Sequence, residues 1–173
     1  MSQYAEIIRQ IDRGPLAEGL ALLPPKMTSQ AARAQLLKTA LQESRGVHRR
    51  QINGPARGLW QFELGAIHGH GANGKEWGLF VHPATRDYLI QVAKERGVSP
   101  TPVAIHRALE HDDVLAAAVA RLNYWWVPAP MPDPYNEPGS WHYYNSTWAP
   151  GKPHRHTWPQ FHREVLDYLS CNR

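Results

Sequence analysis

The chain has 173 residues, of which 42% are hydrophobic. This length can bury a sizeable core but is too short for two ordinary domains, so we expect a single domain over residues 1–173. No stretch reaches the apolar length of a membrane span, and we expect none. The formal net charge of +4 favours an anionic partner, a description that fits both nucleic acid and the bacterial wall.

The first 27 residues predict an N-terminal helix and a lead-in to the next element. The segment Met1 to Gln10 is amphipathic and lacks the apolar run of a secretory signal, so we expect synthesis in the cytoplasm. The single cysteine, Cys171, excludes an intramolecular disulfide framework. We expect it to be a free thiol without a catalytic role.

The segment Thr28 to Ser44 predicts a core helix, with its first or second residue as the N-cap. Leu36, Ala40 and Glu43 lie at positions i, i+4 and i+7, so the carboxyl of Glu43 shares a stripe with apolar side chains. Partial burial disfavours the charged form and raises the pKa of a carboxyl group. A glutamic acid that is protonated near neutral pH can donate its proton to a departing sugar oxygen. The alternative is a solvated glutamate near a helix end.

A loop follows, with Gly54, Pro55 and Gly58 as helix breakers before the compact run 59–63. A short hairpin over Gly58 to Glu63 fits this pattern. The only compact basic run, Arg45 to Arg50 with Arg57 nearby, lies beside the proposed acid. It either attracts an anionic glycan or is a solvated loop, and it is too small for a nucleic-acid face, so we expect no nucleic-acid partner.

Later segments predict further helices and no run of alternating strands, so the expected fold class is mainly α. Gly97 ends a helix over Ala84 to Arg96, and Thr101-Pro102 begins a helix that reaches about Glu110. Asp112 or Asp113 caps a helix through Trp126, in which the alanines of 116–120 permit close packing. Thr157 and Gln160 form a capping box for a last helix, Trp158 to about Leu169.

The proline-rich segment Val127 to Gly139 predicts a stiff, non-helical path. It is either a surface connector or a cleft wall that carries Tyr135 to a substrate. Of the 7 tryptophans, Trp60 is the best candidate for stacking on a sugar ring, because it lies within the loop after the proposed acid.

Histidines give no compelling metal site. The candidates His68-x-His70 and His154-x-His156, with His162 further on, lack the spacing of a catalytic zinc site, and no His-Glu-x-x-His motif occurs. A nucleophilic triad is not indicated either, because no Gly-x-Ser-x-Gly elbow occurs. We therefore expect no metal and no cofactor.

Two motifs, Glu43-Ser44 and Gly58-Leu59-Trp60-Gln61, are joined by a third further on, Tyr144-Asn145. In this order they resemble the lysozyme-like superfamily, in particular the soluble lytic transglycosylases and goose-type lysozymes. The third motif departs from the family pattern, because Ser146 and Thr147 replace its small Ala and Gly. Phe161 aligns best with a tyrosine that such families often place on a last helix, and that role is not transferred.

This resemblance implies a lysozyme-like domain in which Glu43 is the catalytic acid. It implies that Ser44 helps to hold the site and that Gly58 to Gln61 line the sugar cleft together with Tyr144 and Asn145. Glu63 matches an acidic residue thought to activate water in goose-type lysozymes. Two outcomes stay open: hydrolysis with Glu63, or transglycosylation with a 1,6-anhydro product and Glu63 as a structural residue.

We therefore expect a monomeric enzyme that cleaves the β-1,4 bond between N-acetylmuramic acid and N-acetylglucosamine in bacterial peptidoglycan. The missing secretory signal suggests a phage or prophage lysin that a holin releases or that the virion carries. One alternative is a non-catalytic glycan-binding or virion-structural protein with this fold. A second is a glycosidase for another aminosugar polymer, such as chitin or chitosan.

Overall fold

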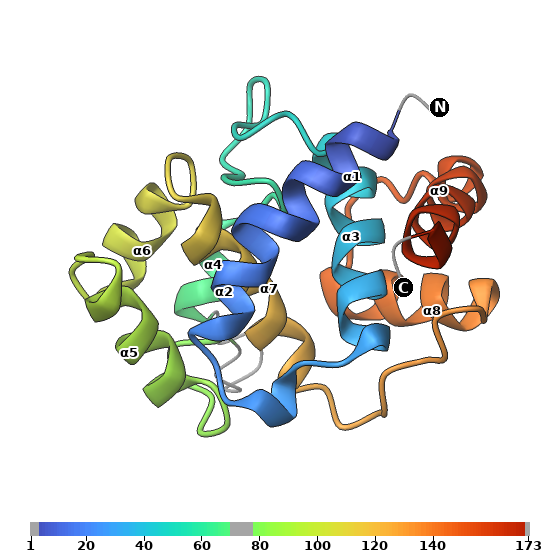
Figure 1. The fold of residues 1–173 in the computed structure, drawn as a ribbon. Helices are drawn as coiled ribbons and strands as arrows, with labels where there is room; N and C mark the ends of the chain where they lie inside the picture. Colours follow the sequence, from blue (N-terminus) through green and yellow to red (C-terminus); the bar gives the residue numbers. More distant parts are fainter. Residues whose placement is uncertain (1–3, 70–77, 172–173) are drawn as a thin grey trace.

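The computed structural model describes residues 4–69 and 78–171, and their fold is mainly helical, as predicted (Figure 1). One cluster of buried side chains extends from Ile8 to Leu169. No helix in the described ranges is long and apolar enough to cross a membrane. The elements follow in the order α1 (Ala5–Ile11), η1 (Asp12–Leu16), α2 (Ala17–Ala21), η2 (Pro25–Met27), α3 (Gln30–Ser44), α4 (Leu64–His68), α5 (Arg86–Glu95), α6 (Pro102–Ala108), α7 (Asp113–Trp125), α8 (Glu137–Trp148), η3 (Arg155–Thr157) and α9 (Trp158–Cys171).

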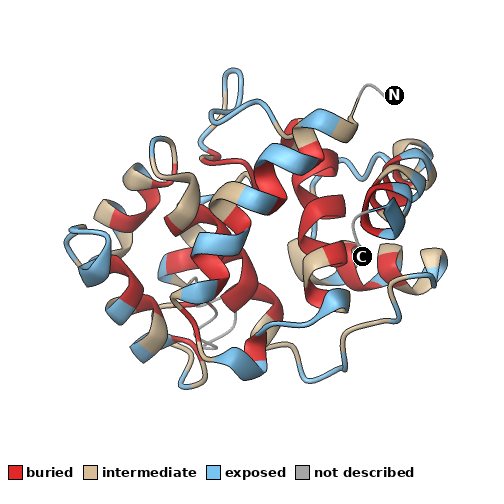
Figure 2. Ribbon diagram, in the orientation of Figure 1, coloured by how far each residue is buried: buried red, intermediate tan, exposed pale blue. Residues whose placement is uncertain are grey.

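Helix α3 confirms the predicted core helix. The Ser29 hydroxyl caps its start by accepting a hydrogen bond from the Ala32 amide at 3.0 Å. Arg45 ends the helix in the left-handed conformation, and the Gly46 amide bonds back to the Ala40 carbonyl at 3.2 Å. Figure 2 shows α3 buried along most of its length. Glu43 therefore lies in the last turn of a buried helix.

Helix α7 is the second buried helix, and it also begins as predicted. The Asp112 carboxylate accepts from the Leu115 amide at 2.9 Å, which settles the N-cap on the first of the two aspartates. The alanine-rich run lets α2 approach closely: a Cβ added at Gly19 would lie 2.8 Å from the Cβ of Ala117. Residues 115–120 are all fully buried. Small residues thus bring two helices together in the core.

The other predicted helices are confirmed with small shifts of their ends. Helix α5 lies within the expected range, α6 ends at Ala108 rather than near Glu110, and α9 continues past Leu169 to Cys171. The predicted capping box is wrong. Thr157 lies in η3, and its hydroxyl donates instead to the Gln42 side chain at 3.0 Å and to the His154 carbonyl at 2.8 Å.

The proline-rich connector is shorter than predicted, because its last residues belong to helix α8. Pro138 occupies the first turn, where its missing amide hydrogen costs no intrahelical bond. The Asn136 side chain caps this helix by accepting from the Gly139 amide at 3.0 Å. The expectation that residues up to Gly139 are non-helical was therefore wrong from Glu137 onwards.

A buried carboxylate joins the N-terminal helices to α3 and α9. Asp12 is 3% exposed and accepts two hydrogen bonds from Arg33, the shorter at 2.6 Å. It also accepts from the Tyr168 hydroxyl at 3.0 Å. A buried charge needs such partners to offset its lost hydration.

The Asp12 contact predicts a measurable loss of stability. Asp12→Asn removes the charge that pairs with Arg33, and we expect the free energy of unfolding to fall by about 2 kcal/mol. Urea denaturation followed by circular dichroism measures this change. Glu6→Gln is the matched control, because it breaks an exposed ion pair with Arg9 and should change little. Equal effects of the two substitutions would contradict the assignment.

Candidate active site

The last turn of α3 and the middle of α8 meet at the proposed acid. The Tyr144 hydroxyl donates a hydrogen bond to Oε1 of Glu43 at 2.6 Å, although the two residues are 101 positions apart in the chain. The first and third motifs of the sequence are therefore in direct contact.

Burial raises the pKa of Glu43 from 4.5 to about 7. The hydrogen bond from Tyr144 and the positive charge of Arg45 both lower this pKa, but burial outweighs them. The pKa of the Tyr144 hydroxyl is raised by burial and by the neighbouring carboxylate, so it stays a donor. A carboxyl with this pKa is partly protonated near neutral pH and can act as a general acid.

Glu43 and Tyr144 line a cleft with a volume of about 1290 Å³. Lining residues also come from the segment after Gly58 and the first turn of α4, and from the end of α7 with the start of the connector. The far wall is formed by the end of α8 and the segment that follows it, residues 146–152 with His154. The cleft brings polar and aromatic side chains from distant parts of the chain together with the Glu43 carboxyl.

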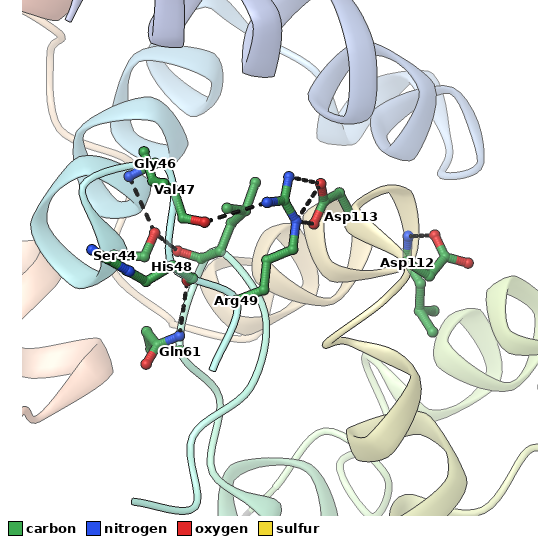
Figure 3. Close-up of polar contacts among 10 residues, drawn as sticks. Ser44, Gly46, Val47, His48, Arg49, Gln61, Asp112 and Asp113 are labelled. Atoms are coloured by element: carbon green, nitrogen blue, oxygen red, sulfur yellow. Dashed lines mark hydrogen bonds and ion pairs between the residues drawn. The ribbon is translucent and has the colours of Figure 1, made fainter. Parts of the chain in front are cut away.

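Ser44 fastens the end of α3 to the loop that carries the second motif. Its hydroxyl donates to the Leu59 carbonyl at 2.7 Å and to the Ala40 carbonyl at 3.0 Å. It also accepts from the Gly46 amide at 3.2 Å, a contact shown in Figure 3. Ser44 is buried, and it is not among the described residues that line the cleft. It thus holds the last turn of α3 against the loop.

Gly58 begins a tight turn that needs a glycine. Its φ is +77°, and an added Cβ would lie 2.8 Å from the Leu109 carbonyl oxygen. The Gln61 amide closes the turn by donating to the Gly58 carbonyl at 2.9 Å, and Arg57 pairs with Phe62. The predicted hairpin is therefore a turn with isolated bridges, and the described residues around it form no extended strand.

Gln61 lines the cleft at the end of this turn. Its side-chain amide donates to the Gly58 carbonyl at 2.8 Å and to the His48 carbonyl at 3.2 Å, and Figure 3 shows the second bond. These bonds fix the side chain against the loop and leave its amide oxygen as a possible acceptor for a ligand.

Trp60 does not line the cleft, so the prediction that it stacks on a sugar was wrong. It is fully buried, and its indole N–H donates to the Leu36 carbonyl at 2.9 Å. Leu59 is buried as well. The tight turn directs both side chains into the core behind α3, which makes them supports for the cleft floor.

Trp126 and Trp148 line the cleft instead, at the ends of α7 and α8. The indole N–H of Trp148 donates to the Trp60 carbonyl at 3.0 Å, so α8 is tied to the turn. Sequence reasoning missed both residues. The sequence did hold a signal for them. Trp126 ends a predicted helix just before the proline-rich segment, and Trp148 lies just before the helix breakers Pro150 and Gly151.

Aromatic rings hold Tyr144 in position. Trp158 stacks on it with ring centroids 4.9 Å apart, and Trp148 and Trp141 lie at 6.4 Å and 5.4 Å. Phe161 on α9 contributes no hydroxyl, and the Arg45 guanidinium packs over its ring at 4.8 Å. The hydroxyl at Glu43 thus comes from α8 and not from the last helix.

Asn145 follows Tyr144 but lies on another side of α8, and it is absent from the described lining of the cleft. Ser146 and Thr147 do line it. Their hydroxyls donate to carbonyls one turn back in the helix, at 2.8 Å and 2.7 Å. The predicted contact of Asn145 with substrate is therefore not supported by its position.

Glu63 shares the cleft with Glu43. It is exposed and precedes the first residue of α4 without capping that helix through its side chain. No other described residue forms an ion pair with its carboxylate. This second carboxylate is thus open to solvent and to a ligand.

Acidic partners neutralise much of the basic run. Arg49 binds Asp113 with its closest contact at 2.6 Å, and Arg57 binds Glu110 at 3.0 Å (Figure 3 shows the first pair). The Arg45 guanidinium donates to carbonyls at the end of α3. Paired charges contribute less to the attraction of a distant anion, which favours a structural reading of this run.

Two of the candidate metal ligands, His154 and His156, have ring centroids 5.9 Å apart. In residues 4–69 and 78–171, no group of three His, Cys, Asp or Glu side chains could hold a metal ion. His68 ends α4, His162 is buried in α9, and His70 lies outside the described residues.

The start of the proline-rich connector forms part of the cleft wall, because Val127 and Pro128 line the cleft. Tyr135, the residue of the connector that was expected to reach a substrate, is 52% exposed and is not among the described lining residues.

Comparisons of the chain with protein-family models, with curated proteins and with solved structures each gave no match. The case for a function therefore rests on the chemistry of the cleft and on the motifs that form it.

The raised pKa of Glu43 predicts a pH-dependent stability. The folded chain keeps this proton up to about pH 7, whereas an unfolded chain releases it near pH 4.5, so the free energy of unfolding falls as the pH rises between these values. Glu43→Gln removes this contribution. Between the acidic and alkaline ends of the window, we expect the free energy of unfolding of the variant to rise by about 3 kcal/mol relative to that of the wild type. Urea denaturation at a series of pH values measures it, and parallel stability curves for the two proteins would contradict the burial of this carboxyl.

Removal of the Tyr144 hydroxyl should raise the pKa of Glu43 further. Tyr144→Phe deletes the hydrogen bond that stabilises the carboxylate, while the ring and its stacking remain. NMR titration of the glutamate side-chain carboxyl carbons measures the pKa. Tyr143→Phe is the matched control, because that hydroxyl donates to backbone carbonyls away from Glu43. A Glu43 pKa that stays constant or falls in Tyr144→Phe contradicts the contact.

Proposed function

We propose that this protein is a peptidoglycan-cleaving enzyme with a lysozyme-like fold, and that it acts on the β-1,4 bond between N-acetylmuramic acid and N-acetylglucosamine. The observation that carries the proposal is the carboxyl of Glu43, which lies in a cleft, accepts a hydrogen bond from Tyr144 and has a pKa raised to about 7. One residue of each motif, Glu43, Gln61 and Tyr144, lines this cleft, and this supports the proposal.

In the first step, protonated Glu43 donates its proton to the glycosidic oxygen as the bond to the anomeric carbon breaks. The leaving sugar departs as an alcohol, and positive charge develops on the ring that remains. Tyr144 then stabilises the new Glu43 carboxylate through its hydrogen bond. Burial favours the protonated state before the step, and the tyrosine limits the cost of the charge after it.

Two routes complete the reaction. In the hydrolytic route Glu63 takes a proton from water, and the resulting hydroxide equivalent attacks the anomeric carbon. In the transglycosylase route the Glu43 carboxylate takes the proton of the sugar's own 6-hydroxyl, and that oxygen attacks the anomeric carbon to give a 1,6-anhydro ring. The open position of Glu63 in the cleft is compatible with the first route, and the raised pKa of Glu43 is compatible with the second.

Wall digestion by substituted proteins tests this proposal. We expect Glu43→Gln to lower the rate of wall lysis by roughly a thousandfold, because a general acid is lost. Loss of turbidity in suspensions of purified wall measures the rate. The variant keeps the shape of the side chain, so its circular dichroism should match the wild type. Substantial lysis by Glu43→Gln contradicts the role of Glu43, and wall binding without lysis by the wild type identifies a glycan-binding protein instead.

Mass spectrometry of the released muropeptides separates the two routes. Reducing-end products that disappear in Glu63→Gln support hydrolysis. Anhydro products that persist in Glu63→Gln support transglycosylation.

A further inference from the structure

One wall of the cleft carries a cation that the proposed reaction does not use. Lys152 lies in the segment after α8 and lines the same cleft as Glu43. No other lysine or arginine is among the described residues that line the cleft. Its place in the chain is outside the motifs that identified the acid.

The segment around Lys152 is held at both ends. Pro150 and Pro153 restrict the backbone on either side of it. At its start, Ala149 adopts a left-handed conformation and closes α8 by bonding to the Asn145 carbonyl at 3.0 Å. A long side chain on a restricted segment loses less freedom when it binds a ligand.

At its far end the segment is tied to α3. The Gln42 side chain donates to the His154 carbonyl at 3.1 Å and accepts from the Thr157 hydroxyl at 3.0 Å. Gln42 immediately precedes Glu43. The backbone that carries Lys152 is therefore fixed relative to the proposed acid.

Lys152 has no acidic partner in the part of the chain that the structure describes. The neighbouring cation Arg155 differs, because it binds Glu137 at 2.7 Å. Two arginines of the run 45–50 also form ion pairs: Arg49 binds Asp113, and Arg50 lies 3.8 Å from Glu110. Lys152 is thus the cleft cation whose charge is open to a ligand.

The positive charge that lowers the pKa of the proposed acid comes from another residue. The cation that lowers the pKa of Glu43 is Arg45, which belongs to the end of α3. Lys152 lines the cleft but contributes no hydrogen bond to Glu43.

We propose that Lys152 binds a carboxylate on the glycan and so selects an anionic aminosugar polymer over a neutral one. This inference rests on the proposed function, and it assigns the selection to Lys152 rather than to the arginine run. His154 lines the same wall and adds a ring nitrogen that can hydrogen-bond the same substituent. A lysine ammonium forms a charge-assisted hydrogen bond with a carboxylate, which a neutral acetamido sugar cannot offer.

Two parts of peptidoglycan carry this chemistry. In strands without peptides, the lactyl group of each muramic acid is a free carboxylate. In strands with peptides, that group is an amide, and the carboxylates lie on the stem peptide. Chitin oligosaccharides have the same backbone linkage and no carboxylate.

Binding of three soluble glycans tests the inference: chitohexaose, peptide-free glycan strands and peptide-bearing strands. Glu43→Gln serves as the background, because it prevents turnover, and tryptophan fluorescence reports occupancy since Trp126 and Trp148 line the cleft. Lys152→Ala and Lys152→Arg are compared in this background. Lys94→Ala is the matched control, an exposed lysine on α5 outside the cleft.

We expect Lys152→Ala to weaken binding of at least one carboxylate-bearing strand by about tenfold, with chitohexaose unchanged. Lys152→Arg should restore most of the affinity, and Lys94→Ala should have no effect. The strand that responds identifies the lactyl group or the stem peptide as the source of the carboxylate.

An equal loss for chitohexaose, no loss for any glycan, or no binding of any glycan overturns the inference. Wall lysis by the wild type is measured separately. Lys152-dependent binding by a protein that lyses no wall contradicts the proposed catalysis and leaves the carboxylate site standing.

Discussion

The hydrogen bond between Tyr144 and the half-buried Glu43 is the contact on which the rest of the site depends. Burial alone raises the carboxyl pKa, and the tyrosine and Arg45 lower it, so the value near 7 is a balance between desolvation and stabilisation of the charge. Such a balance requires α3 and α8 to keep a fixed separation. A small displacement of either helix would change both the solvent access of the carboxyl and the length of the bond.

Several contacts outside the Glu43–Tyr144 pair maintain that separation. Ser44 ties the end of α3 to the turn at Leu59, and the indole of Trp148 ties α8 to the same turn through the Trp60 carbonyl. Trp158 stacks on the Tyr144 ring from α9. The second motif thus serves as the joint between the two helices that supply the acid and its donor. This role explains why Trp60 faces the core although the next residue, Gln61, lines the cleft.

Local signals predicted the helices that carry the site, and tertiary contacts decided the rest. Ser29 and Asp112 cap α3 and α7 as short polar residues before apolar runs, and the stripe of Leu36 and Ala40 correctly indicated partial burial of Glu43. The direction of Trp60 depends on positive φ values in a tight turn, which side-chain type does not reveal. The sequence could not indicate that Lys152 is an unpaired cation either, because the ion pairs of the arginines form only in the folded chain.

The pH dependence of glycan cleavage by the wild-type protein tests the central claim most directly. A general acid must be protonated, so the value of kcat/KM on soluble peptidoglycan strands should fall as the pH rises through about 7, the pKa of Glu43. The midpoint of this fall should move to higher pH in Tyr144→Phe. A rate that is constant through this range, or that already falls near pH 4.5, the ordinary value for the side chain, would contradict the account.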